Sequence, residues 1–261
     1  MTRPKSDLDR VRALIAAGNN DCEVSRATGI PRGTIRDWRK NKGAARPRQL
    51  LLSLGSLQRH PEDRSQTPCP RCDLVAIDEN AYAYLLGMYL GDGCLTPFPR
   101  EVFKLRIACD FAYPGIVSEW LRAIDAIKTD GAAANTVAGS GCVELYSMWK
   151  HWVCLFPQHG PGPKHLRRIT LAEWQEQIAD RYPDRLLRGL VHSDGCRYAN
   201  TVNGTAYWSY AFSNNSQDIQ AIFTAACDRL GIRWRRASWK MISITRRRDV
   251  EKLDLFIGPK A

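Results

Sequence analysis

A stretch that occurs twice constrains this chain more than any other sequence feature. The copies span residues 84–93 and 185–195, and each contains a Leu-Leu pair, a glycine and, five residues after that glycine, Asp-Gly. The aspartates, Asp92 and Asp194, are 102 residues apart, which leaves room for one small α/β half-domain between them. A repeat at such a spacing largely determines the architecture. We therefore expect two equivalent halves, each begun by an apolar helix that ends in a carboxylate.

Small residues on both predicted helices indicate that the helices pack against each other. Gly87 and Gly91 lie four residues apart on one helix face, and Gly189 and Ser193 occupy the same two positions of the second copy. Glycine inside a helix costs about 1 kcal/mol relative to alanine. Without a side chain, however, two helix backbones can approach closely. The pattern predicts a helix crossing that brings the two following aspartates together.

The blocks Leu85 to Gly93 and Leu187 to Gly195 resemble the motif of the LAGLIDADG homing endonucleases. In that family each half is an αββαββα unit, the motif helices cross at a pseudo-twofold axis, and two sheets form a saddle in the DNA major groove. The resemblance implies an α+β chain with two pseudo-symmetric αββαββα half-domains, residues 78–183 and 184–261, that form a β-saddle. It also implies a monomer that reads an asymmetric site in double-stranded DNA.

The same resemblance implies that Asp92 and Asp194 are the catalytic, metal-binding acids. Mg²⁺ and similar divalent cations prefer oxygen ligands, and such ions can activate water and stabilise a leaving oxygen during phosphodiester hydrolysis. The alternative is that both aspartates belong to helix-terminal Asp-Gly turns that hold no metal.

One departure from the family pattern leaves two functions open. Family members often carry a lysine at the end of the second strand of each half, where this chain has Asp110 and Asn215. Lys104 and Lys240 lie on or beside predicted strands and are candidates to replace those lysines. The two motif aspartates favour a Mg²⁺-dependent, site-specific endonuclease. The missing lysines favour a DNA-binding transcriptional regulator that cuts slowly or not at all.

The first 42 residues predict a separate small all-α domain. Helical apolar spacing predicts one helix ending at Gly18, a second ending at Gly29 and a third over residues 32–40. This pattern resembles the trihelical helix-turn-helix units of resolvases and transposases. The alternative is a helical hairpin with a solvated basic face. The residues expected to face DNA on the third helix are Arg32, Thr34, Arg36 and Arg39.

The charge of the chain favours an anionic partner. The 261 residues carry a formal net charge of +11, and residues 1–50 hold 12 Lys and Arg against 5 Asp and Glu. Such a balance is typical of nucleic-acid binding. We find no signal-peptide pattern and no apolar run of 18 residues. The nine scattered cysteines are expected to be reduced thiols in the cytoplasm, with the protein associated with the nucleoid.

A Cys-x-x-Cys pair lies in the predicted basic linker, residues 43–77. Cys69 and Cys72 have the spacing of half a zinc site, but a tetrahedral structural site needs four ligands. His60 is a candidate third ligand. The alternative is a turn with two incidental thiols, and the sequence alone does not choose between this turn and a zinc site.

The C-terminal part predicts a basic sheet surface. A hairpin is expected across Asn203-Gly204, followed by a helix over 216–230, strands over 233–239 and 241–245, and a helix over 249–257. Alternation of basic and apolar residues fits a sheet that buries one face and lays the other on DNA; a solvated basic face is the alternative. The expected DNA contacts are Arg233, Arg235, Arg236, Lys240 and Arg246.

Overall fold

The computed structural model describes residues 5–40, 67–128, 132–137, 141–202 and 204–258. The chain divides into two compact units, residues 1–50 and 51–261. Within the described ranges, no helix combines the length and the apolar character needed to cross a lipid bilayer.

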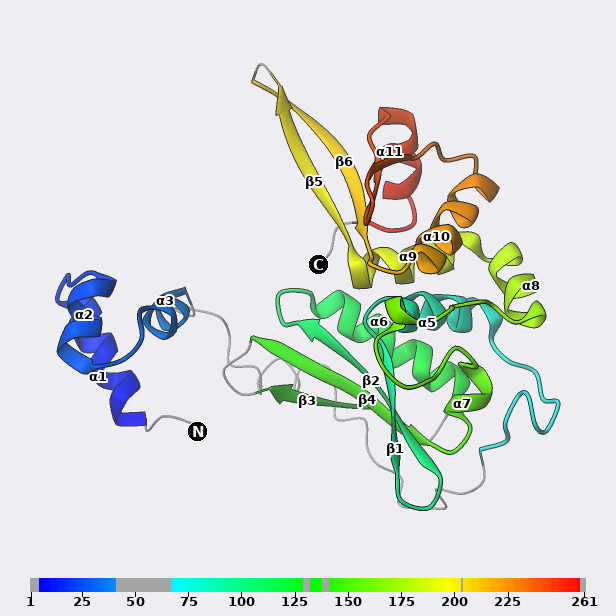
Figure 1. The fold of residues 1–261 in the computed structure, drawn as a ribbon, viewed down its shortest axis with the longest axis horizontal. Coiled ribbons are helices and arrows are strands. Elements are labelled where there is room, and N and C mark those ends of the chain that lie inside the picture. The colour runs from blue at the N-terminus through cyan, green and yellow to red at the C-terminus, as the bar shows by residue number, and fades with distance from the viewer. Residues whose placement is uncertain (1–4, 41–66, 129–131, 138–140, 203, 259–261) are drawn as a thin grey trace. The chain divides into compact units, whose positions relative to one another are not determined.

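The first unit contains the three helices expected from the sequence (Figure 1), which are α1 (Lys5–Ala16), α2 (Asp21–Thr28) and α3 (Arg32–Lys40). Asn20 and Glu23 form a capping box at the start of α2, because each side chain accepts a hydrogen bond from the backbone N–H of the other. Gly29 ends α2 with a φ of +68°, a conformation that favours glycine. A small core joins the helices and consists of Val11, Val24, Ile30 and Ile35.

The second unit repeats one order of elements. The first half contains α5 (Glu79–Gly91), β1 (Cys94–Phe98), β2 (Val102–Asp110), α6 (Pro114–Ile127), β3 (Ala133–Val137), β4 (Cys142–Trp149) and α7 (Trp152–Leu155). The second half contains α9 (Pro183–Asp194), β5 (Gly195–Val202), β6 (Thr205–Ser213), α10 (Gln217–Arg229), β7 (Arg235–Ser238), β8 (Met241–Ile244) and α11 (Arg247–Asp254). A 3₁₀ turn, Lys164–Leu166, and α8 (Glu173–Arg181) connect the halves. Both halves are αββαββα, as predicted.

The two sheets have equivalent topologies. Their strand orders are β1-β2-β4-β3 and β5-β6-β8-β7, and every pairing is antiparallel. Along β4, buried and half-buried residues alternate strictly, which is the pattern of a strand with one face on the core. Figure 1 shows the β1–β4 sheet and the β5–β6 hairpin extending from opposite sides of the α5–α9 pair. This arrangement agrees with the predicted pseudo-symmetry.

Helices α5 and α9 cross at two glycines. A Cβ on Gly87 would lie 2.4 Å from the Leu186 carbonyl oxygen and 2.9 Å from the Gly189 Cα. A Cβ on Gly189 would lie 2.2 Å from the Tyr84 carbonyl oxygen. The predicted close crossing is therefore confirmed. Helix α5 is buried continuously over residues 81–90, because the other elements of the unit surround it.

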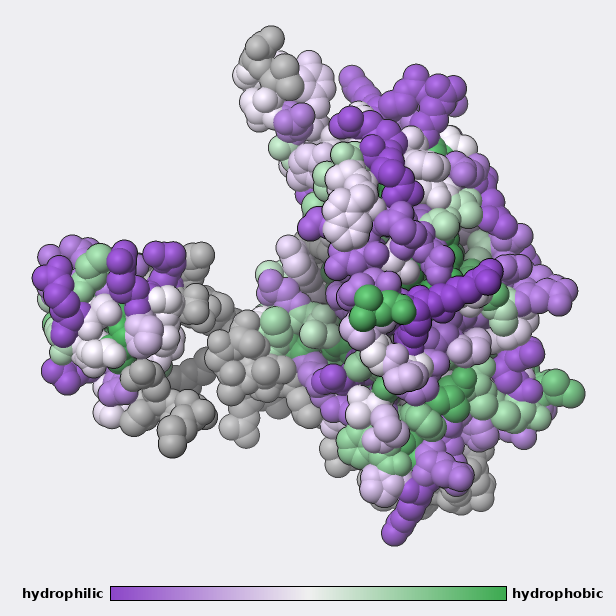
Figure 2. Space-filling view, in the orientation of Figure 1, coloured by the Kyte–Doolittle hydropathy of each residue, from purple (hydrophilic) through white to green (hydrophobic). Residues whose placement is uncertain are grey.

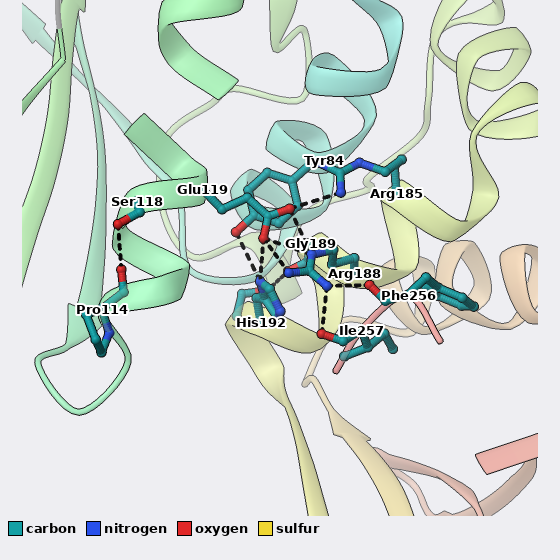
Figure 3. A network of polar contacts seen from close by, with 11 residues as sticks. Tyr84, Pro114, Ser118, Glu119, Arg185, Arg188, Gly189, His192, Phe256 and Ile257 are labelled. Carbon is teal, nitrogen blue, oxygen red and sulfur yellow. Dashed lines mark hydrogen bonds and ion pairs between the residues drawn. The ribbon is translucent and has the colours of Figure 1, made fainter. Parts of the chain in front are cut away.

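A buried ion network links the two halves beside this crossing (Figure 3). Glu119 of α6 accepts from Arg188 of α9 at 2.8 Å, and Arg185 and His192 of α9 lie 3.0 and 3.9 Å from the same carboxylate. Arg188 also donates to the carbonyl of Ile257 at 2.7 Å. Burial opposes the charge on Glu119, but the two arginines outweigh it and lower the pKa of that carboxyl.

Two local predictions differ from the structure. The sequence pattern predicts no strand at residues 94–98, where the structure has β1; Pro97 is tolerated there because β1 is an edge strand. The apolar residues 149–156 predict a short helix, but α7 begins only at Trp152, because β4 continues through Trp149. Neither difference changes the order of elements expected for the half.

Candidate active site

A pocket of about 950 Å³ lies where the two motif helices end. Its walls include Asp92 at the end of α5 and Asp194 at the end of α9. The structure thus brings both sequence-predicted carboxylates, one from each half, into a single pocket. Their catalytic and metal-binding roles stay predictions.

The absence of a side chain at Gly91 allows this convergence. A Cβ there would lie 2.5 Å from the Ser193 Cβ and 3.1 Å from the Asp194 Oδ2. Ser193 itself cannot move away easily, because its hydroxyl donates toward the carbonyl oxygens of Gly189 and Leu190, each at 3.0 Å. The end of α5 therefore lies directly against the carboxylate that ends α9.

Lys164 is a pocket residue that the sequence reading missed. Its ammonium donates to the last carbonyls of α5, those of Tyr89, Leu90 at 3.1 Å and Gly91 at 2.9 Å, and lies over the Tyr89 ring. A cation at the negative end of a helix dipole is stabilising. The only sequence signal was its place directly after Gly160-Pro-Gly-Pro163, in the connection between the two motif copies.

Burial dominates the electrostatics of Lys164. It lowers the pKa of this ammonium to about 8, although the charges of Asp194 and Asp92 oppose the shift. The two carboxylates lie at helix C-termini, where the helix dipole is unfavourable for a negative charge. The pocket therefore favours additional positive charge near Asp92 and Asp194.

Asp194 is held by its own half. The side-chain amide of Asn214 donates to the Asp194 Oδ2 at 2.6 Å, and the backbone N–H of Asn214 donates to the Lys240 carbonyl at 3.0 Å. These bonds join the end of β6 to the β7–β8 turn beside the carboxylate. Asn214, Asn215 and Lys240 all line the pocket.

The two lysines considered as replacements lie in different places. Lys240 is exposed and forms part of the pocket wall. Lys104 lies on β2, pairs with Glu144 and stands over the Tyr146 ring at 4.4 Å. Asp110, at the end of the same strand, accepts from the Ala112 N–H at 2.9 Å. Lys240 is therefore the lysine of this pair that the structure brings to the carboxylates.

The donor atoms of the pocket fit a hard divalent cation. Its two aspartates offer carboxylate oxygens, whereas the amide oxygen of Asn214 accepts from the Ser216 N–H at 2.7 Å and its NH2 group donates to Asp194. Mg²⁺ binds through one or two carboxylates and keeps several waters, and the two aspartates supply that number of carboxylates. Asp92 and Asp194 are the residues that would hold the ion.

The basic residues predicted to form one surface in the second half are distributed over separate places. Arg235 is exposed on β7, whereas Arg236 donates to Gln217 and Gln220 of α10. Arg233 precedes β7, and with Arg246 it lines a second pocket of about 520 Å³. The predicted strand over 233–239 is thus shorter than expected, because β7 covers only Arg235–Ser238, and the DNA contacts of these residues stay predictions.

The second pocket lies at the start of α11 and is strongly basic. Its walls also include Arg247, Arg248 and Lys252, with Asp249 as its one acid. Figure 2 shows hydrophilic side chains gathered over this part of the surface. Backbone N–H groups at a helix N-terminus and nearby arginines both favour anions.

The first unit presents part of its predicted contact set. Arg32 and Arg36 are exposed on α3, and Thr34 is half-buried. Ile35 of the same helix is buried in the small core, which orients the arginines outward. The side chain of Arg39 lies outside the described residues.

The Cys-x-x-Cys pair meets two further metal-binding side chains. Cys69 and Cys72 lie with His151 and Cys154, and the ligand atoms of all four are within 4.8 Å of one another. His60, the third ligand considered from the sequence, lies outside the described residues. The partners, His151 directly before α7 and Cys154 within it, are remote from the Cys-x-x-Cys pair in the sequence.

Similar proteins were found among solved structures. No protein-family model and no curated protein sequence matches this chain. Among solved structures, the homing endonuclease I-DmoI in complex with DNA and Ca is 18% identical with a TM-score of 0.45, and the match covers 69% of this chain and 89% of that one. The LAGLIDADG meganuclease I-AabMI bound to uncleaved DNA is 12% identical with a TM-score of 0.42, covering 67% and 82%.

A third solved structure is the N-terminal LAGLIDADG domain of WhiA. It is 14% identical with a TM-score of 0.41, and the match covers 69% of this chain and 83% of that domain. The similarity to LAGLIDADG proteins that the two sequence motifs indicated is therefore found again in the comparison of structures.

Proposed function

We propose that this chain is a double-stranded-DNA-binding protein and a divalent-cation-dependent, site-specific endonuclease that acts as a monomer. The observation that carries the proposal is the single pocket in which both motif aspartates lie with two lysines, Lys164 and Lys240. Hydrolysis of a phosphodiester needs an activated water and positive charge that stabilises the phosphate and the leaving oxygen. Two carboxylates that can hold a divalent cation, with two lysines beside them, match those needs.

Each pocket residue has a definable task in this proposal. Asp92 and Asp194 hold the divalent cation, which when bound supplies Lewis-acid activation of water and of the phosphate. Asn214 orients the Asp194 carboxylate through its 2.6 Å hydrogen bond. Lys164 holds the last turn of α5 and thereby positions Asp92. Lys240, which is exposed on the wall, is placed to bind the phosphate.

DNA binding is supported by charges outside the pocket. Arg32 and Arg36 on α3, Arg235 on β7 and the basic pocket at α11 offer exposed cations in both units. Phosphate contacts of this kind release counterions, so the affinity is expected to fall as salt rises. The charge-neutral double variant Arg32→Gln with Arg36→Gln should weaken binding and reduce the salt dependence.

A DNA-binding regulator without cleavage is the second candidate, and one contact favours it. The Lys164 ammonium donates to three backbone carbonyls, so this lysine holds the fold. It is therefore not available to take the place of the lysines that assist cleavage in the family. Lys240 is then the pocket lysine placed to contact DNA. A regulator would retain the pocket as a structural feature and bind DNA without hydrolysing it.

The full chain, incubated with Mg²⁺ and a library of randomised duplexes, tests the proposal. We expect sequence-specific double-strand cuts that Asp92→Asn or Asp194→Asn abolishes while both variants still bind the selected duplex. Salt-sensitive binding without cuts in Mg²⁺ or Mn²⁺ would identify the regulator. Cuts that persist in both aspartate variants would overturn the assigned site.

A further inference from the structure

Four metal-binding side chains converge in the first half, away from the aspartate pocket. Cys69 and Cys72 lie in a turn before α5, and His151 and Cys154 lie at the start of α7. Cys72 is 79 residues from His151 and 82 residues from Cys154 along the chain. None of the four lines the pocket that contains Asp92. Their meeting is a product of the tertiary fold.

The distances among the ligand atoms of Cys72, His151 and Cys154 match a tetrahedral metal site, and the Cys69 Sγ lies within 4.8 Å of all three. The Cys72 Sγ lies 3.6 Å from the His151 Nδ1 and 3.6 Å from the Cys154 Sγ, and the Cys154 Sγ lies 3.7 Å from the His151 Nδ1. Tetrahedral zinc, with Zn–S of about 2.3 Å and Zn–N of about 2.0 Å, places its ligand atoms about 3.5 to 3.8 Å apart. A disulfide would need sulfur atoms about 2.0 Å apart.

We propose that Cys69, Cys72, His151 and Cys154 bind one structural Zn²⁺ ion. Three thiolates and an imidazole are a ligand set typical of structural zinc. Four protein ligands fill the tetrahedral shell and leave no position for water or substrate, so the site is not catalytic. The set completes the half-site recognised in Cys69-Pro-Arg-Cys72.

The local backbone already has the shape that such a site needs. Cys69 begins a tight turn in which its carbonyl accepts from the Asp73 N–H at 2.8 Å, while its own N–H donates to the Asp73 carboxylate at 2.6 Å. His151 precedes α7, and its carbonyl accepts from the Cys154 N–H at 3.0 Å. In both pairs two residues separate the ligands, and the ligand atoms of the two pairs lie within 4.8 Å of one another.

Zinc at this place would join the chain that enters α5 to the end of the first sheet. The segment before α5 is also attached through Cys69, which is buried in the main core, and through the Arg71 guanidinium, which lies over the Trp174 ring at 4.7 Å. Because α5 carries Asp92 at its far end, the ion would fix the start of the helix that forms the proposed active site. The second half has Cys196 exposed on β5 and Cys227 buried in its core, so it contains no matching cluster among the described residues.

Metal analysis of the full-length chain tests the site. We expect about one zinc ion per chain after expression in zinc-supplemented medium and purification without chelator. Exchange for Co²⁺ should give the visible d–d bands and the thiolate charge-transfer absorption of a tetrahedral sulfur-rich site. Cys154→Ser should lose the zinc almost completely, whereas the matched control Cys196→Ser should retain it.

Two further comparisons separate this site from others. The double variant Asp92→Asn with Asp194→Asn should keep its zinc, because the aspartate pocket is distinct. If Cys154→Ser does not fold, the metal content and the Co²⁺ spectrum of the wild-type chain still decide the matter. Wild-type protein without zinc, an octahedral Co²⁺ spectrum, or full zinc retention in a folded Cys154→Ser variant would each overturn the proposal.

Discussion

The two halves of the second unit share one topology but hold their motif aspartates by different means. In the second half, Asp194 is bonded by Asn214, a residue of the same half. In the first half, the helix that ends at Asp92 is capped by Lys164, which comes from the connection between the halves. The two motif copies thus place the carboxylates, while residues outside the motif copies contact the end of α5 in one half and the Asp194 carboxylate in the other.

The halves also differ in what stabilises their periphery. The first half contains the Cys-Cys-His-Cys cluster and contributes Glu119 to the ion network, while the second half contributes Arg185 and Arg188. In addition, Arg197 and Tyr210 of the second sheet bind Asp254 of α11. The contacts of the two halves therefore match at the α5–α9 crossing and differ farther from it.

The largest effect is expected at the symmetric crossing. Gly87→Ala and Gly189→Ala each force a methyl group into the facing helix backbone and should lower the free energy of unfolding of the second unit by about 3 kcal/mol. Denaturant unfolding of each variant measures this. Gly33→Ala, in α3 with nothing within 4 Å of the added Cβ, is the control and should stabilise its helix slightly. Unequal losses at the two crossing glycines would contradict the symmetry.

A similar loss, measured in rate, is expected from Lys164→Met. Without the ammonium, the last turn of α5 loses its cap, and displacement of Asp92 by about 1 Å should lower the rate of DNA cleavage by about 100-fold. Lys104→Met is the matched control, since that lysine pairs with Glu144 outside the pocket. If Lys104→Met lowered the cleavage rate as much as Lys164→Met, the functional lysine would be Lys104 on β2 and not Lys164 in the segment that connects the halves.

A smaller loss of stability is expected from Glu119→Gln, which leaves Arg185 and Arg188 without their carboxylate. At neutral pH the free energy of unfolding should fall by about 2 kcal/mol, less than for a fully buried pair because the arginines are partly exposed. Denaturant titration measures this change. Glu251→Gln, which breaks an exposed pair with Arg247, serves as the control and should have little effect.

The same variant carries a pH prediction. The pKa of Glu119 is lowered in the folded chain, so its contribution to stability is complete above the ordinary carboxyl pKa and is lost as pH falls through the folded value. The difference between wild type and Glu119→Gln should therefore disappear in acid. A difference that is constant from neutral to acidic pH would show that the carboxylate charge does not link the halves.

The smallest effect is expected from Asn214→Ala. Loss of one hydrogen bond to the Asp194 carboxylate should lower the cleavage rate by about tenfold, equivalent to about 1.4 kcal/mol. Single-turnover cleavage at saturating DNA isolates this step. A loss greater than that of Lys164→Met would reverse the comparison, because the second half would then depend more strongly on its positioning residue than the first.

Much of the fold could be predicted because it depends on local patterns. The repeated motif and its small residues predicted the α5–α9 crossing, and apolar periodicity with turn residues predicted most helices and strands. β1 was missed because Pro97 weakens a strand pattern that the pairing with β2 nevertheless supports. The three helices of the first unit were likewise readable from their spacing and their glycine stops.

Several residues of the candidate sites come from distant parts of the chain, and no motif spacing predicts that they meet. Lys164 reaches the end of α5 from 73 residues away, and His151 and Cys154 meet Cys72 across 79 to 82 residues. A periodic pattern specifies which face of an element is buried, because burial repeats with the geometry of the helix or strand. Which distant residue arrives at a given point depends on how the elements pack. The pair of aspartates was thus determined by the repeat, while the lysine beside them and the two missing metal ligands were decided by tertiary packing.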